Sequence, residues 1–124
     1  MRYDPIFRYN GWDRRVFKRW KGYMGLVNDH HVIPKQFRNH PVVKTTKFDI
    51  NGNFNLVIMP TSHGITELNM DPKTIPHTNH PRYNHQVKCM LDHINLYYDD
   101  KQCKDYRLWL LVNWLKENGK YLMM

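Results

Sequence analysis

Three stretches decide the fold of this chain: DHHVIP at residues 29–34, FNLVIMP at residues 54–60 and HTNHPRYN at residues 77–84. The first two contain short apolar runs that end at a proline, which is typical of short strands. Asn51-Gly52, between them, is a strong turn signal. In the third stretch, Pro81 suits the first position of a helix. The order predicts two strands followed by a helix, with histidines on the first strand and at the start of the helix.

The rest of the chain predicts helices on both sides of this unit. Apolar residues at helical spacing predict a helix over residues 13–23, with one apolar face and basic residues elsewhere. A helix over residues 80–98 is indicated by an apolar stripe of Tyr83, Val87, Met90, Leu91, Ile94 and Tyr98. A last helix is predicted over residues 102–118, ended by Gly119; its centre is apolar nearly all round, so we expect it to be the core helix. Residues 61–76 are expected to form a long loop.

Size and composition place the chain among small globular proteins. It has 124 residues, so we expect a single domain over residues 1–124, with the strand–strand–helix core at about residues 27–98. Hydrophobic residues make up 41% and charged residues 24%, which excludes wholesale disorder as the leading interpretation. No apolar run approaches the roughly 18 residues of a membrane span, and the N-terminus has no apolar signal-peptide region.

Charge and cysteine content point to a class of partner and to a compartment. The formal net charge is +8, which favours a polyanion as the partner, with nucleic acid ahead of an anionic membrane surface. The expected partner is nucleic acid, DNA above all, and no membrane partner is expected. The two cysteines, Cys89 and Cys103, form no CxxC pair, so a cysteine zinc knuckle is excluded. Cys89 falls in an apolar helical pattern and is expected to be buried. We expect a reducing, intracellular location, without distinguishing cytoplasm, host cell and virion.

Four of the eight histidines stand out by their spacing. His77 and His80 are three residues apart at the start of a helix, so their side chains can converge on one ion. His30 and His31 are adjacent on a strand, so one can bind a metal while the other faces a substrate. Imidazole suits zinc, manganese and nickel, whereas magnesium normally wants carboxylates as well. Asp29 could contribute one, although strand alternation would turn it away from His30. The remaining histidines are expected at the surface or in capping positions: His40, His63, His85 and His93.

At these three stretches the sequence resembles the AHH branch of the HNH, or ββα-metal (His-Me finger), endonuclease superfamily. That family has an HH-aliphatic-aliphatic-Pro strand, then Asn-aliphatic-x-aliphatic-Pro, then a His-x-x-His-Pro-x-Tyr helix start. The resemblance covers about residues 30–87 and departs at Asp29, where the branch usually has alanine. It implies an α+β fold, a small single domain whose ββα-metal core is flanked by an N-terminal and a C-terminal helix.

The resemblance also implies a role for each site residue. His31 is expected to be the general base, and Asn55 to orient the base and its loop. His30, His77 and His80 are expected to hold one divalent metal ion, of which zinc, manganese, nickel and magnesium all remain open. Two further residues are expected to support the ligands: Asn84, and Tyr83, which is equally expected in the core.

The resulting hypothesis is a metal-dependent endonuclease that hydrolyses phosphodiester bonds of DNA, with RNA left open as a substrate. A neutral imidazole can take a proton from water near neutral pH, and a metal can stabilise the leaving 3′-oxygen. Basic residues that could hold flanking phosphates, or be ordinary surface charge, are Lys35, Arg38, Lys44, Lys47 and Arg82. The alternative is a non-catalytic nucleic-acid-binding or packaging protein on a metal-stabilised ββα scaffold, which would not need His31. Target sequence and oligomeric state stay open.

Overall fold

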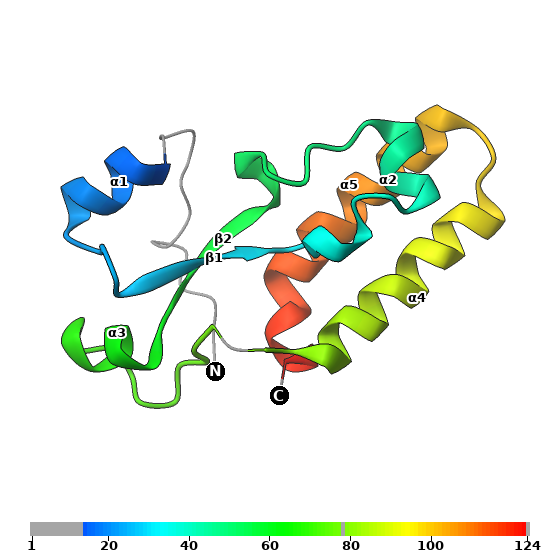
Figure 1. Ribbon diagram of the computed structural model, residues 1–124. Coiled ribbons are helices and arrows are strands. Elements are labelled where there is room, and N and C mark those ends of the chain that lie inside the picture. Colours follow the sequence, from blue (N-terminus) through cyan, green and yellow to red (C-terminus); the bar gives the residue numbers. More distant parts are fainter. Residues whose placement is uncertain (1–13, 78, 124) are drawn as a thin grey trace.

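The computed structural model describes residues 14–77 and 79–123 (Figure 1). In chain order the elements are α1 (Arg14–Lys21), β1 (Val27–His31), η2 (Lys35–Phe37), α2 (Pro41–Thr46), η3 (Asn53–Asn55), β2 (Leu56–Pro60), α3 (Ser62–Glu67), α4 (Pro81–Tyr97), α5 (Lys101–Asn118) and η4 (Gly119–Leu122). Over the described residues this is the expected α+β fold, with one two-stranded sheet. The expected helix start at Asp13 lies outside them.

The two strands form an antiparallel pair that joins two hydrophobic cores. His30 lies opposite Val57 in the pairing register. Every residue of β2 is buried. Alternate side chains of the strand point to opposite faces, and a hydrophobic cluster covers each face. On one face, Leu56 and Ile58 pack with Val27 in a small cluster. On the other face, Val57 and Met59 join the larger cluster formed with the helices.

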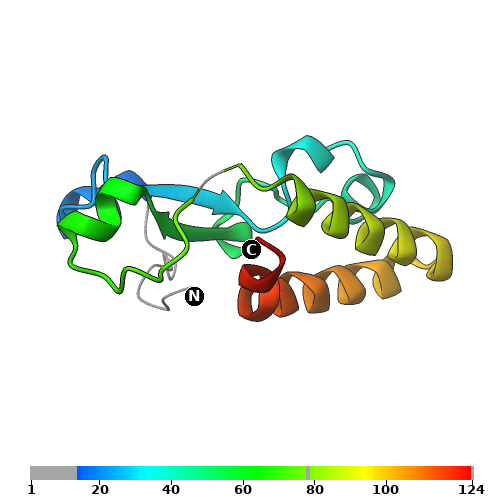
Figure 2. The ribbon, with the colours of Figure 1, turned by 90° about the horizontal axis from the view of Figure 1, so that it is seen from below.

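The larger core lies among α2, α4 and α5, which contact one another. Figures 1 and 2 show α4 and α5 side by side along their lengths. As predicted, α4 buries an apolar stripe, here made of Tyr83, Val87, Leu91 and Ile94. α5 begins where Asp100 caps it, the carboxylate accepting from the backbone N–H of Gln102 at 3.1 Å. None of the helices in the described residues has the length and apolar content of a membrane span.

The expected loop over residues 61–76 is partly wrong, since it contains α3. The Thr61 hydroxyl caps this helix by accepting from the Gly64 N–H at 2.9 Å. The helix packs so closely on the chain before β1 that a Cβ at Gly64 would collide with the backbone carbonyl of Leu26. Gly64 permits this close approach of two backbones because it has no Cβ.

Two burial expectations are also wrong. α5 buries a single face, through Leu108, Val112 and Leu115, whereas Trp109 and Trp114 are 52% and 46% exposed, because neighbouring elements among the described residues cover only one side of the helix. Cys89 is exposed, since it lies off the buried stripe of α4. On the predicted apolar face near the start of the chain, the side chains of Val16, Trp20 and Met24 are exposed, and the Phe17 side chain lies outside the described residues.

Candidate active site

Three histidines from β1 and from the segment that leads into α4 meet in space. His30 lies in β1, His77 precedes α4, and His80 occupies the N-cap position of α4 without a side-chain capping bond. The backbone N–H of His77 donates to the carbonyl of Pro60 at 2.8 Å, which fastens this segment to the end of β2. The ring centroids are 5.1 to 5.9 Å apart, and one nitrogen of each ring lies within 4.8 Å of the others. The predicted cluster therefore exists in space.

Two residues of the first turn of α4 hold this cluster in place. The amide oxygen of Asn84 lies 3.1 Å from Nδ1 of His80. An amide oxygen only accepts, so this contact puts the proton on Nδ1 and the lone pair on Nε2. The buried Tyr83 hydroxyl donates to the carbonyl of Val32 at 2.6 Å, and its ring lies 5.2 Å from that of His30. Tyr83 is thus both a core residue and a support for the cluster.

Burial favours the neutral form of His30 and of His77. His30 is 1% exposed, and both of its ring nitrogens are enclosed by the protein. Burial, and then the neighbouring His80, His77 and His31, lower the pKa of His30 well below its ordinary value. Burial first, then His80 and His31, also lower the pKa of His77, against an opposing effect of Asp29. Neutral imidazole is the form that binds a metal ion.

The donor set fits a divalent transition metal. It offers three imidazole nitrogens, and among the described residues no carboxylate or thiol joins the group. Imidazole ligands suit zinc, manganese and nickel, whereas magnesium prefers oxygen ligands and retained water. Three protein ligands also leave coordination positions open, as catalytic sites do.

His31 lies beside the cluster and is held by a residue that sequence reasoning did not select. Its Nε2 is 3.1 Å from the amide oxygen of Asn51. Asn55, the residue expected to orient the base, directs its side-chain amide to backbone groups. Its buried amide instead accepts from the Ile33 N–H at 2.8 Å and donates to the carbonyls of Ile33 and Ile50 at 3.0 and 2.9 Å. Asn55 therefore fastens the backbone just after His31 to the backbone just before Asn51.

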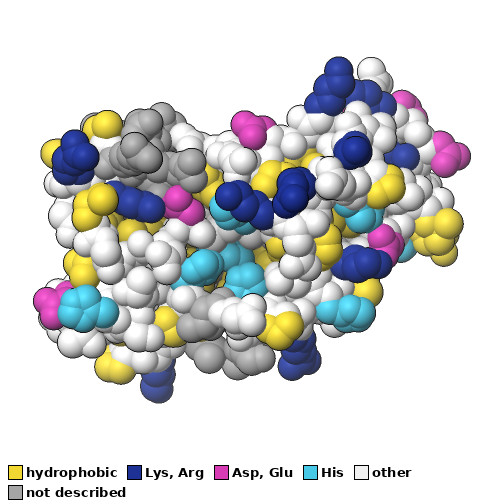
Figure 3. All heavy atoms as spheres, in the orientation of Figure 1, with side chains coloured by type: hydrophobic (Ala, Val, Ile, Leu, Met, Phe, Trp, Pro, Cys, Tyr) yellow, Lys and Arg dark blue, Asp and Glu magenta, His cyan; other side chains and the backbone are white. Residues whose placement is uncertain are grey.

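The four histidines border one open cleft of about 440 Å³. Its lining residues are Asp29, His30, His31, Pro34, Lys35, His77, Asn79, His80 and Asn84. Asp29 reaches this cleft despite the expected alternation, and its carboxylate pairs with Lys18 of α1 at 3.2 Å. In Figure 3 histidine side chains gather at the middle of the face, with Lys and Arg side chains beside them. The cleft therefore combines imidazoles with positive charge.

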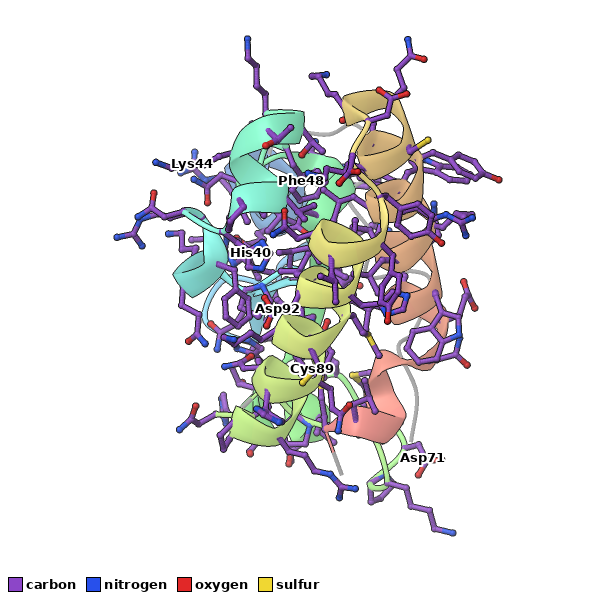
Figure 4. The ribbon with its side chains drawn as sticks, turned by 90° about the vertical axis from the view of Figure 1, so that its right-hand side faces the viewer. His40, Lys44, Phe48, Asp71, Cys89 and Asp92 are labelled. Atoms are coloured by element: carbon purple, nitrogen blue, oxygen red, sulfur yellow. The ribbon has the colours of Figure 1, made fainter. Side chains whose placement is uncertain are left out.

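Of the predicted phosphate-binding residues, Lys35 lines the cleft, while Arg38, Lys44, Lys47 and Arg82 are exposed outside it. Figure 4 shows Lys44 pointing outward from α2. α2, which carries Lys44, packs against α4, which carries Arg82.

The other four histidines lie outside the candidate site. His40 caps α2: its Nδ1 accepts from the Val42 N–H at 3.1 Å, and its Nε2 lies 2.7 Å from Asp92 of α4 (Figure 4). Three are exposed on helices and contact a residue one turn on: His63, His85 and His93. These positions agree with the expected surface and capping roles.

Comparison with protein families supplies one match. Residues 10–108 match the model of the AHH family, described as a nuclease family of the HNH/ENDO VII superfamily with conserved AHH. Comparison with curated proteins and with solved structures gives no significant match.

Proposed function

Because the chain belongs to the AHH family of nucleases, we propose that it is a metal-dependent endonuclease that hydrolyses phosphodiester bonds of DNA. One observation carries the proposal: His31 borders the same cleft as the cluster of His30, His77 and His80. A general base beside a metal-binding cluster is what hydrolysis of a phosphodiester by water requires. A protein that only binds nucleic acid has no use for that pairing.

His31 is the proposed general base. A neutral imidazole with a pKa near the ordinary value of about 6.5 can take a proton from water at neutral pH. The water oxygen then forms a bond to phosphorus, the bond from phosphorus to the 3′-oxygen breaks, and that oxygen takes up a proton. His31 is only half-buried and borders an open cleft, so a water molecule and a phosphate can reach it.

His30, His77 and His80 are the proposed metal ligands. A divalent ion bound there would stabilise the negative charge that grows on the phosphate and on the leaving oxygen. The lone pair on Nε2 of His80 follows from the hydrogen bond between Nδ1 and Asn84. The lowered pKa values of His30 and His77 keep both rings in the ligating form at neutral pH.

Basic residues are proposed to hold the nucleic-acid backbone across the cleft. Lys35 lies at its edge and is placed to contact a phosphate next to the scissile one. Four exposed basic residues are proposed to extend this contact: Arg38, Lys44, Lys47 and Arg82. Such contacts position the backbone and read no sequence, so we expect cleavage with weak sequence preference.

The test is a plasmid-cleavage assay with zinc, manganese, nickel or magnesium, and with a chelator control. We expect metal-dependent nicking and linearisation by the wild type, and loss of cleavage in His31→Ala with metal binding retained. His63→Ala is the matched control, because His63 is exposed and lies outside the cleft. Binding of DNA without cleavage under all four metals would favour the non-catalytic alternative. Cleavage of RNA alone would correct the substrate.

A further inference from the structure

The turn between the two strands carries an asparagine whose side chain reaches the proposed base. Asn51 belongs to neither strand, and its sequence signal, Asn51-Gly52, indicates only a turn. Its amide oxygen nevertheless lies 3.1 Å from Nε2 of His31, a residue twenty positions earlier. Because the two residues are far apart in the sequence, this contact depends on the tertiary fold.

The backbone around Asn51 is fixed from both sides. The N–H of Asn51 donates to the carboxylate of Asp49 at 3.2 Å, and the N–H of Gly52 donates to the carbonyl of Asp49 at 3.1 Å. On the other side, the buried Asn55 amide donates to the carbonyl of Ile50 at 2.9 Å. The turn is therefore tied to the residue just before β2, and the exposed Asn51 side chain extends from this fixed backbone to His31.

The chemistry of the contact determines which nitrogen of His31 can act as a base. An amide oxygen has lone pairs and no proton, so it can only accept a hydrogen bond. With this oxygen facing Nε2, a neutral His31 carries its proton on Nε2 and its lone pair on Nδ1. A group that fixes the tautomer of a base also fixes the direction from which it can take a proton.

We propose that Asn51 is a positioning residue, whose amide oxygen holds His31 in the Nε2–H tautomer and presents Nδ1 as the base. The inference rests on the proposed function for its catalytic consequence, while the hydrogen bond itself does not depend on activity. Asn55 acts further back, by fixing the turn that carries Asn51.

The experiment combines NMR with kinetics on the full chain. Long-range ¹H–¹⁵N spectra of the imidazoles at pH 8, assigned with His31→Ala, should show the His31 proton on Nε2 and slow to exchange with water. Asn51→Ala should lose that slow exchange, and Asn51→Asp should keep it, because a carboxylate oxygen also accepts. In plasmid cleavage, Asn51→Ala should lower kcat by roughly 3- to 10-fold with KM unchanged, as expected for one lost hydrogen bond.

Asn95→Ala is the matched control. Asn95 is exposed on α4, fifteen residues beyond His80 and therefore about 22 Å along the helix axis. It should change neither the His31 spectrum nor kcat. A proton on Nδ1 of His31 in the wild type would overturn the proposal, as would an Asn51→Ala variant with unchanged exchange and kcat, or one with only KM raised. Wild-type protein that cleaves no nucleic acid would contradict the proposed function and leave the spectroscopic test of the hydrogen bond intact.

Discussion

Replacing Asn55 with alanine should destabilise the whole protein, although the residue lies in the single 3₁₀ turn η3 that precedes a five-residue strand. The side chain is 0% exposed and makes three hydrogen bonds, one from the Ile33 N–H and two to the carbonyls of Ile33 and Ile50. Each such bond contributes roughly 0.5–1.5 kcal/mol, and a buried N–H left unsatisfied costs about 1–3 kcal/mol. We therefore expect Asn55→Ala to lower the free energy of unfolding by about 3 kcal/mol, with the Tm falling by roughly 12 °C.

The assay is urea unfolding at pH 7, followed by circular dichroism. Asn95→Ala is the control, and as an exposed substitution it should change the free energy of unfolding by less than about 0.5 kcal/mol. If the free energy of unfolding of Asn55→Ala lay within about 1 kcal/mol of the wild-type value, the reasoning would be refuted. Water would then satisfy the backbone groups of Ile33 and Ile50 that the substitution leaves without the amide.

Asn55→Asp refines the test, because it keeps the shape of the side chain and replaces only the amide NH₂ donor with an oxygen. One carboxylate oxygen can still accept from the Ile33 N–H, but the other faces the carbonyls of Ile33 and Ile50. Burial and this repulsion should raise the pKa of the carboxyl in the folded state, so its cost relative to wild type is full at pH 7 and shrinks as pH falls. Destabilisation that stays constant from pH 7 to pH 5 would contradict the proposed geometry.

Further predictions concern the histidines and the cleft. His30→Ala should weaken zinc binding in calorimetric titration, whereas His31→Ala should keep zinc binding and lower cleavage by roughly 10²–10⁴-fold. Equal loss of zinc binding in both variants would contradict the separate roles of ligand and base. Burial lowers the pKa of His30 in the folded state, so below about pH 6.5 the unfolded chain binds more protons than the folded one. The free energy of unfolding should therefore decrease as the pH falls, by up to about 1.4 kcal/mol per pH unit. Urea unfolding from pH 7 to pH 5 measures this, and His30→Leu should flatten the slope. Lys35→Ala should reduce the salt dependence of DNA binding by about one unit of slope, whereas Lys101→Ala, paired with Asp105, should leave it unchanged.

The sequence predicted those parts of the fold that local pattern determines. The strand–strand–helix order and the buried stripe of α4 follow from apolar spacing and proline, and the convergence of His30, His77 and His80 follows from that order. Asn51 was missed, because a turn signal does not say which distant side chain the turn will meet.

The errors come from properties that depend on neighbours. α3 was missed because Gly64 indicates a loop locally, whereas its value here comes from contact with Leu26, thirty-eight residues earlier. The exposed Trp109 and Trp114 follow from the absence of an element over the outer side of α5 within the described residues, which no helical pattern encodes.

The burial of β2 on both faces has a consequence for insertions and deletions. Its residues are apolar throughout, so a one-residue slip against β1 would exchange Leu56 and Ile58 with Val57 and Met59 between the two cores. Hydrophobicity alone discriminates weakly between these registers. Asn55 discriminates strongly, since a slip would place an aliphatic side chain where the backbone of Ile33 requires an amide. The asparagine before the strand thus fixes the register of the strand pair. A single-residue insertion between Asn55 and Pro60 should therefore destabilise the protein far more than one in the exposed turn between α4 and α5.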